Sequence, residues 1–144
     1  MMKMFVIGAA ALVAAAAVST VASAATPADG LWRAESGGGV IELHECGDAL
    51  CGRLSDSNGL RLNPFIKDDA NPRPELRDHL IHGMDILHGF HGGPTEWTNG
   101  RIYNPNSGKT YTGSLKLLDS DHIKLSGCLV YPLCKSQVWR RIPE

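Results

Sequence analysis

Strict alternation of apolar and polar residues late in the chain constrains the fold more than any other sequence feature. In Tyr111–Leu117 every second residue, starting from Tyr111, belongs to one face, and the residues between them are polar. The pattern returns in Ile123–Leu129, after a short aspartate-rich turn at Asp119–Asp121. Because successive side chains of a β-strand point to opposite faces, these segments predict two half-buried strands joined as a hairpin.

Further strands are expected at Leu31–Glu35, Val40–Glu45, Cys51–Ser55 and Ser136–Ile142. Glu96–Tyr103 predicts another hairpin, since Asn99-Gly100 suits a tight turn with positive φ, and Asn104–Lys109 predicts the next turn. About eight short strands with tight turns favour an all-β fold, either a closed antiparallel barrel or a sandwich. Closure would remove the exposed sheet edges that recruit other chains.

Arg61–Gly93 shows little of this alternation. We expect residues 56–85 to form one long connection that covers an end of the sheet. Proline is tolerated at the first position of a helix, so Pro74–Arg77 predicts a short helical turn within the connection.

The first 24 residues have the pattern of a secretory signal peptide. Lys3 gives a positive start, Phe5–Val18 carries no charge, and Ala22-Ser23-Ala24 is a small-residue cleavage site. Cleavage after Ala24 or Ala25 would leave a single domain over residues 25–144, periplasmic or secreted, with no membrane span. A membrane anchor is the alternative, although the apolar run is short for a spanning helix.

Four cysteines agree with export, because small exported domains are often stabilised by disulfides. Cys46 and Cys51 flank a predicted four-residue turn, and Cys128 and Cys134 flank a similar short segment. We therefore expect the pairs Cys46–Cys51 and Cys128–Cys134. A zinc site built from all four cysteines is the alternative, but the spacing fits it less well.

Charge and motifs exclude several functions. The net charge of -1 leaves no basic face for nucleic acid. The chain has no Gly-x-Ser-x-Gly or His-Glu-x-x-His motif, so we expect no enzyme and no cofactor. Glu42 and His44 share one face of a predicted strand. Pointing inward they would be an acid–base pair, and pointing outward, which is favoured, they are ordinary surface residues.

Four histidines lie close together in the sequence, at His79, His82, His88 and His91. Imidazole groups bind zinc and copper, and Asp78 or Asp85 could orient one of these rings. The alternative is a polar, glycine-rich loop with solvated histidines, because the spacing matches no strict zinc motif.

Several segments of the chain together resemble a known family. They are Gly30-Leu31-Trp32, Cys46–Gly52, Leu76-Arg77 with Gly83, Ile86–Phe90, Gly100–Tyr111 and Gln137–Arg141. This set is similar to domain-of-unknown-function family 2147, small exported bacterial proteins, over nearly the whole mature chain. The resemblance implies a lipocalin-like β-barrel and no particular reaction. His79-Leu80, His82 and His88 depart from the family pattern, so the resemblance does not support a metal site there.

The start and end of the domain also resemble the wider lipocalin-type barrels. In those barrels a tryptophan of the first strand packs under an arginine of the last strand. The resemblance implies that Trp32 packs with Arg141 or Arg140, which is a structural role.

A barrel of about eight strands is either filled by side chains or holds one small ligand. Our expected inward residues are bulky, namely Tyr111, Leu115, Leu117, Ile123, Leu125, Leu129 and Trp139. Gly113 and Gly127 would make room for a large neighbour such as Trp139, or mark a bulge. We expect binding of a small apolar or amphipathic ligand at the end covered by residues 56–93, with Phe90, Tyr103, Tyr111 and Trp139 as candidate contacts. The alternative is a structural protein with a filled core that interacts with an envelope protein.

Overall fold

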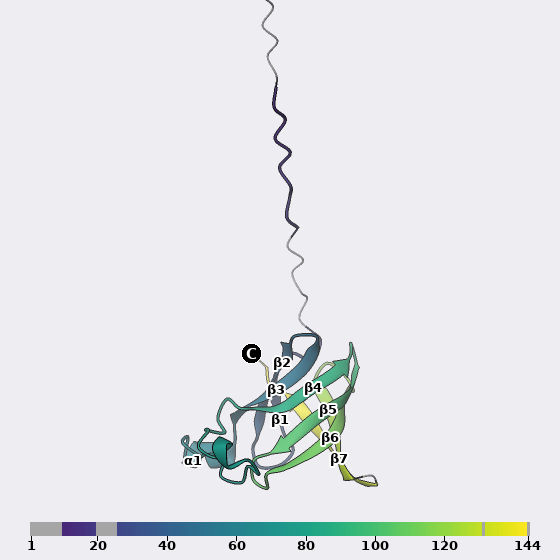
Figure 1. The fold of residues 1–144 in the computed structure, drawn as a ribbon. Coiled ribbons are helices and arrows are strands. Elements are labelled where there is room, and N and C mark those ends of the chain that lie inside the picture. The colour runs from purple at the N-terminus through teal and green to yellow at the C-terminus, as the bar shows by residue number, and fades with distance from the viewer. Residues whose placement is uncertain (1–9, 20–25, 131, 144) are drawn as a thin grey trace, which may run out of the picture.

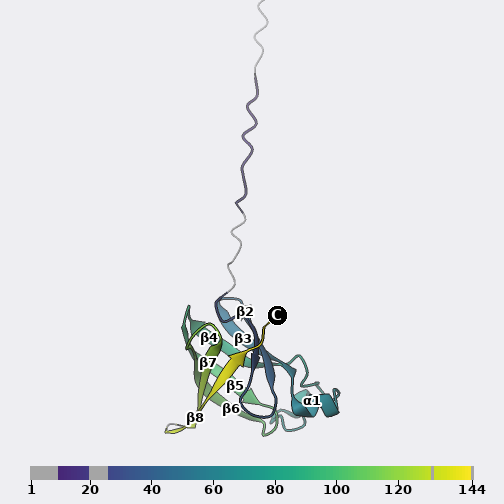
Figure 2. The same ribbon diagram turned by 180° about the vertical axis from the view of Figure 1, so that it is seen from behind.

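The alternating segments form the wall of one barrel in the computed structural model, which describes residues 10–19, 26–130 and 132–143. Within these residues, eight antiparallel strands follow one another in chain order and the last pairs with the first (Figures 1 and 2). They are β1 (Gly30–Arg33), β2 (Val40–Cys46), β3 (Ala49–Asp56), β4 (Asp85–Gly92), β5 (Glu96–Asn104), β6 (Lys109–Leu117), β7 (His122–Val130) and β8 (Leu133–Arg141). The predicted closed barrel is confirmed, and the sandwich is excluded.

Two short helices lie in the connection between β3 and β4. α1 (Asn58–Leu62) begins at Ser57, whose hydroxyl accepts a hydrogen bond from the Leu60 N–H at 3.1 Å. This helix was not predicted from the sequence. The second is a 3-10 turn, η1 (Pro74–Leu76), at the predicted position and with proline at its start.

The inner face of the barrel is filled with apolar side chains from every strand. The buried cluster is Ala28, Trp32, Ile41, Leu43, Leu50, Leu87, Phe90, Trp97, Leu115, Ile123, Leu125 and Trp139. Burying a large apolar side chain contributes about 1.5–3 kcal/mol relative to leaving it exposed. This interior is therefore the main source of the fold's stability.

Two glycines of the inner face keep space for one large neighbour. A methyl group on Gly113 would overlap the Ser126 carbonyl oxygen and the side chain of Ile102, and one on Gly127 would overlap Ile102. The two glycines lie opposite each other in the β6–β7 register. Their predicted role as spacers is confirmed, but the side chain they admit is Ile102 and not Trp139.

The predicted hairpin turn at Asn99-Gly100 is wrong. β5 runs without a break from Glu96 to Asn104, and its register with β6 shifts between Trp97 and Gly100. Asn99 does have a positive φ, of 58°. Asparagine tolerates this conformation in a β-bulge as well as in a tight turn, so the sequence signal was right and its interpretation was not.

The strand β4 was absent from the predicted set. Its core residues Leu87 and Phe90 are three positions apart, whereas a regular strand returns to one face every second residue. The register with β3 shifts on both sides of Gly52, and Gly89 has a φ of 65°. Bulges therefore break the alternation on which the prediction depended.

Leu129 was expected inside the barrel and is 44% exposed. The last register pair between β6 and β7 joins Thr112 to Cys128. Beyond that pair the β7–β8 hairpin extends past the wall, so alternation continues along the strand with no core beneath it.

Both predicted disulfides are present. Cys128 lies directly opposite Cys134, with 4.0 Å between their Cα atoms. The other bridge is diagonal, because β2 and β3 join through a tighter turn than predicted and Cys51 lies opposite His44. The Cα atoms of Cys46 and Cys51 are still only 5.8 Å apart, within the range a disulfide spans.

Trp32 and Arg141 close one end of the barrel, as the resemblance implied. The Arg141 guanidinium carbon lies 4.3 Å from the centre of the Trp32 ring. The same guanidinium donates to the carbonyl oxygens of Asp29 and Ser120 at 2.8 and 2.6 Å. These contacts join the segment before β1 to the β7–β8 side of the wall.

The predicted cleavage position at Ala24 or Ala25 lies outside the described residues, as do residues 1–9 of the predicted leader. Among the described residues, no helix has the length and apolar character needed to cross a membrane.

Candidate functional site

The outer wall of the barrel carries polar side chains between the buried ones. On β4, Leu87 is in the core and His88 faces outward. On β5, Ile102 packs against the core, and Arg101 and Tyr103 on either side of it face outward. His88 lies opposite Arg101 in the sheet. These side chains therefore form one polar patch on the outside of the barrel.

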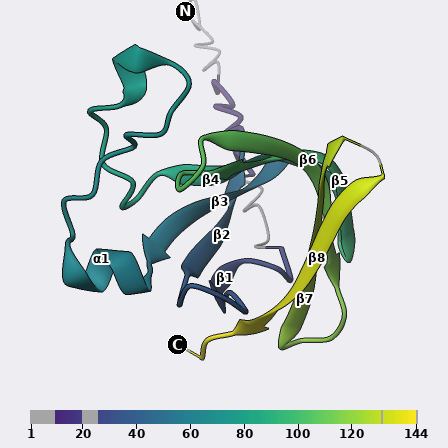
Figure 3. The ribbon, with the colours of Figure 1, turned by 90° about the horizontal axis from the view of Figure 1, so that it is seen from below.

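The connection between β3 and β4 runs outside the barrel, on the side of β3 and β4 (Figure 3). Between this connection and the patch lies a cleft of ≈ 400 Å³. Leu76, His79 and Met84 of the connection line one side, and His88, Arg101, Tyr103 and Thr110 of the strands line the other. Leu60 and Ile81 of the connection pack with Leu54 of β3 in a second buried cluster, and Ile66 and Met84 pack against it. The connection was predicted to cover an end of the sheet. Part of it instead lies along the outside of the barrel wall, facing β4, β5 and β6.

Asp68 fixes the connection to the barrel. It is fully buried, and its two carboxylate oxygens accept hydrogen bonds from the Tyr103 hydroxyl at 2.6 Å and the Asn71 amide at 2.7 Å. Its backbone N–H donates to the His79 carbonyl at 2.8 Å. A buried charge is costly unless it is hydrogen-bonded, so this network defines where the connection sits.

Tyr103 is the residue of β5 that contacts Asp68. Burial, together with the Asp68 carboxylate, raises the pKa of Tyr103 to about 12. At neutral pH the hydroxyl keeps its proton, and the hydrogen bond to Asp68 stays formed.

Arg101 supplies a cation to the cleft, whose two carboxylates both have partners. Asp85 already contacts His44, with 2.9 Å between Asp85 Oδ1 and His44 Nε2. Arg101 donates to Thr112 Oγ1 at 3.1 Å through one nitrogen of its guanidinium. A guanidinium has five N–H donors, so most of its capacity faces the cleft or solvent. The cleft thus combines a cation with the apolar side chains of Leu76 and Met84.

Glu42 and His44 face outward, because they alternate with the buried Ile41 and Leu43 of β2. The favoured surface interpretation is confirmed. The two side chains line a second cleft of ≈ 430 Å³ together with Leu31 of β1. The acid that His44 contacts is Asp85 and not Glu42.

The predicted ligand contacts do not lie together. Tyr103 lines the outer cleft. Phe90 and Trp139 belong to the packed core, and Tyr111 lies on the inner face opposite Ile102. The structure therefore does not bring the four predicted ligand contacts together, and neighbouring core side chains pack around Phe90 and Trp139.

The four histidines are also separated. His79 and His88 line the outer cleft, whereas His82 is exposed before β4 and His91 pairs with Thr98 further along that strand. A strand rises about 3.3 Å per residue, so His88 and His91 are roughly 10 Å apart. In the ranges that the structure describes, no group of three His, Cys, Asp or Glu residues is placed to hold a metal. The structure therefore does not assemble the predicted metal site.

Three residues of the cleft were not predicted from the sequence, namely Asp68, Asn71 and Arg101. Arg101 could have been found from its place beside Ile102, had β5 been recognised as one strand. Asp68 and Asn71 lie in a segment without periodicity, and nothing local to them indicates that they meet Tyr103.

Comparisons with known proteins agree with this architecture. Residues 30–141 match the family described as "Uncharacterized protein conserved in bacteria (DUF2147)". No curated protein matches the chain. Among solved structures, the chain is similar to a protein of Helicobacter pylori, titled as belonging to the lipocalin family, with a TM-score of 0.70 and 18% identity. The similarity covers 81% of this chain and 83% of that one, and at this identity it shows the fold alone.

Proposed function

The chain belongs to the bacterial family DUF2147, and from that premise we propose that it is an exported binding protein for a small amphipathic anion. The ligand lies in the outer cleft, between the β3–β4 connection and the wall of β4, β5 and β6. The proposal is one of binding and not of catalysis.

The combination of Arg101 with an apolar wall carries the proposal. Both acids of the cleft have partners, Asp68 with Tyr103 and Asp85 with His44. The guanidinium of Arg101 is exposed beside them and suits a carboxylate or phosphate head group. Leu76 and Met84 offer a surface for a short apolar tail. A volume of ≈ 400 Å³ suits a molecule of that size.

Two features support a location in the periplasm or outside the cell. The leader has the order of a secretory signal, and both cysteine pairs are disulfides. Disulfides persist mainly in oxidising compartments.

Titration calorimetry with decanoate tests the proposal, with decyltrimethylammonium as a cation of equal chain length. We expect decanoate to bind and the cation not to bind. Arg101→Gln should weaken decanoate at least about tenfold, because a charge-assisted hydrogen bond contributes roughly 1.5–3 kcal/mol. Arg140→Gln is the matched control, an exposed arginine on β8, and should bind like the natural chain. Equal affinity for anion and cation would contradict the proposal.

The filled core favours a second candidate, a structural protein that contacts an envelope protein. Native mass spectrometry of the chain purified from the periplasm separates the two. A co-purifying small anion supports the binding protein, whereas a clean mass with no decanoate binding supports the structural one.

A further inference from the structure

One edge of β8 is open along most of its length. β8 pairs with β7 from Leu133 to Arg140, but it pairs with β1 only at Arg140 and Arg141. β1 is short and ends at Arg33. Within residues 26–130 and 132–143, no strand pairs with β8 from Leu133 to Trp139 on the β1 side.

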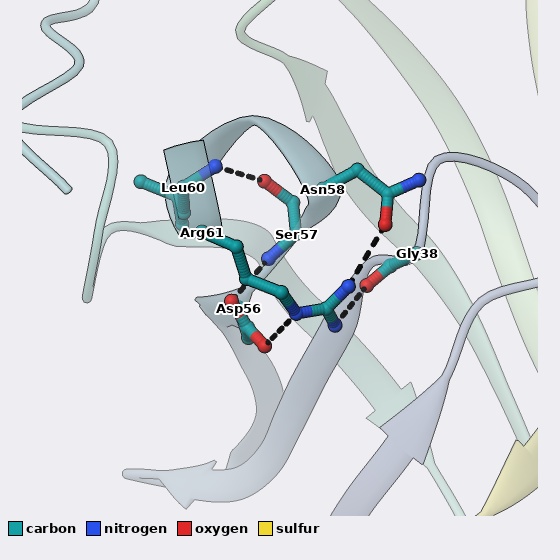
Figure 4. Close-up of polar contacts among 6 residues, drawn as sticks. All are labelled: Gly38, Asp56, Ser57, Asn58, Leu60 and Arg61. Carbon is teal, nitrogen blue, oxygen red and sulfur yellow. Dashed lines mark hydrogen bonds and ion pairs between the residues drawn. The ribbon is translucent and has the colours of Figure 1, made fainter. Parts of the chain in front are cut away.

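The β1–β2 loop is held away from this edge. The Asn58 N–H donates to the Gly37 carbonyl at 3.0 Å, and Arg61 donates to the Gly38 carbonyl at 3.3 Å. Asp56 and Asn58 fix the Arg61 guanidinium at 2.8 Å each (Figure 4). α1 follows β3, so the loop leans to the β3 side, and α1 and β8 lie on opposite sides of the molecule (Figure 3).

The open edge presents unpaired backbone groups of alternate residues. The Arg141 N–H donates to Asp121 on the β7 side, and the Ile142 N–H donates to Leu31 on the β1 side. Backbone groups alternate in direction along a strand. Ser136 and Val138 therefore direct both their N–H and C=O groups to the open edge. Cys134 also directs its C=O to the open edge. Its N–H is not open, since it donates to the Pro132 carbonyl.

The side chains of this edge are exposed and nearly uncharged. Leu133 is 69% exposed and Val138 is 39% exposed. Lys135 is the single charged residue between Lys124 and Arg140. Proteins usually protect long edges with charges, prolines or a covering segment, and this edge has one lysine.

We propose that β8 is the interaction surface for a second copy of this chain, with the two β8 edges paired antiparallel about a twofold axis at Ser136. In this register Ser136 faces Ser136 of the second copy and exchanges both backbone hydrogen bonds with it. Val138 donates to the Cys134 carbonyl of the second copy.

Charge and pairing select this register over its neighbours. Centring the pair on Lys135 would set two lysines directly opposite each other, which is unfavourable. Centring the pair on Gln137 would place Cys134 of the second copy opposite Arg140. That edge of Arg140 is already paired with β1. The register at Ser136 uses the N–H and C=O of Ser136, the N–H of Val138 and the C=O of Cys134, and it sets Lys135 opposite Gln137.

Sedimentation equilibrium of the mature chain, with both disulfides intact, tests the proposal. We expect a dimer at about 100 µM, and Ser136→Ala should leave it unchanged because the backbone N–H remains. Ser136→Pro removes an N–H that no β7 residue uses, and proline is tolerated at such edge positions. This variant should weaken the dimer at least about tenfold with unchanged circular dichroism.

A cross-link keeps the test decisive if the proline variant does not fold. Directly opposed residues of a hydrogen-bonded pair lie about 5.5 Å apart, within disulfide range. Ser136→Cys should therefore form a covalent dimer under mild oxidation, and Lys135→Cys should not. A natural chain that stays monomeric at about 100 µM, or equal cross-linking of both variants, overturns the proposal.

Discussion

At the scale of single residues, Asp68 matters most for the position of the β3–β4 connection. Nothing in its local sequence marks it, yet it is the fully buried carboxylate that joins the connection to β5 through Tyr103. Removing one partner from a buried charged group costs more than the hydrogen bond itself contributes, because the group left behind is desolvated and unpaired.

Tyr103→Phe should therefore lower the free energy of unfolding by about 1–3 kcal/mol, measured by urea denaturation. Tyr111→Phe is the matched control. It removes a hydroxyl from another half-buried tyrosine of the same wall, and it should change stability by less than about 0.5 kcal/mol. Equal losses in the two variants would show that the Asp68 contact contributes nothing specific.

The same variant has a signature in alkaline solution. The pKa of Tyr103 rises on folding from 10.0 to about 12, so its contribution is complete below pH 10 and is lost as pH rises towards 12. The natural chain should lose more stability than Tyr103→Phe between about pH 9 and pH 11.

At the scale of elements, packing between neighbouring strands decides the shape of the wall. Gly100 of β5 has no room for a side chain, because a methyl group there would overlap the ring of Phe90 on β4. The β4–β5 register has no shift, whereas the registers of β4 with β3 and of β5 with β6 do.

Gly100→Ala should cost about 1–3 kcal/mol of stability through overpacking. Combining it with Phe90→Leu should recover part of that loss, with a coupling of about 0.5–3 kcal/mol in a double-mutant cycle. Gly39→Ala is the control, since a methyl group there makes ordinary contacts with Ala34 and Ile41. Strictly additive losses would contradict the packing account.

The β6–β7 hairpin could be predicted because its alternation is unbroken and its turn is short. The disulfides could be predicted because each closes a local turn. β4 could not be predicted, because its core residues Leu87 and Phe90 are three positions apart. The bulge at Asn99 was mistaken for a turn, because a positive φ suits both. The cleft could not be predicted either, because the Asp68–Tyr103 contact depends on how a non-periodic segment returns to the wall.

At the scale of the whole molecule, the barrel and the cleft have separate roles. The interior is occupied by side chains that include all three tryptophans, Trp32, Trp97 and Trp139. The candidate cleft lies outside the wall, under a connection that the buried Asp68 carboxylate joins to β5. The wall is that of a lipocalin-like barrel, and the candidate cleft lies on its outer face.

One NMR titration tests this arrangement directly. Apart from Met1, Met2 and Met4 of the predicted leader, Met84 is the one methionine, so methyl labelling of the mature chain gives a single signal in the cleft. On adding decanoate, the Met84 methyl signal should shift while the indole N–H signals of the three tryptophans stay in place. Shifts of the indole signals with an unchanged Met84 signal would put the ligand inside the barrel and contradict the account.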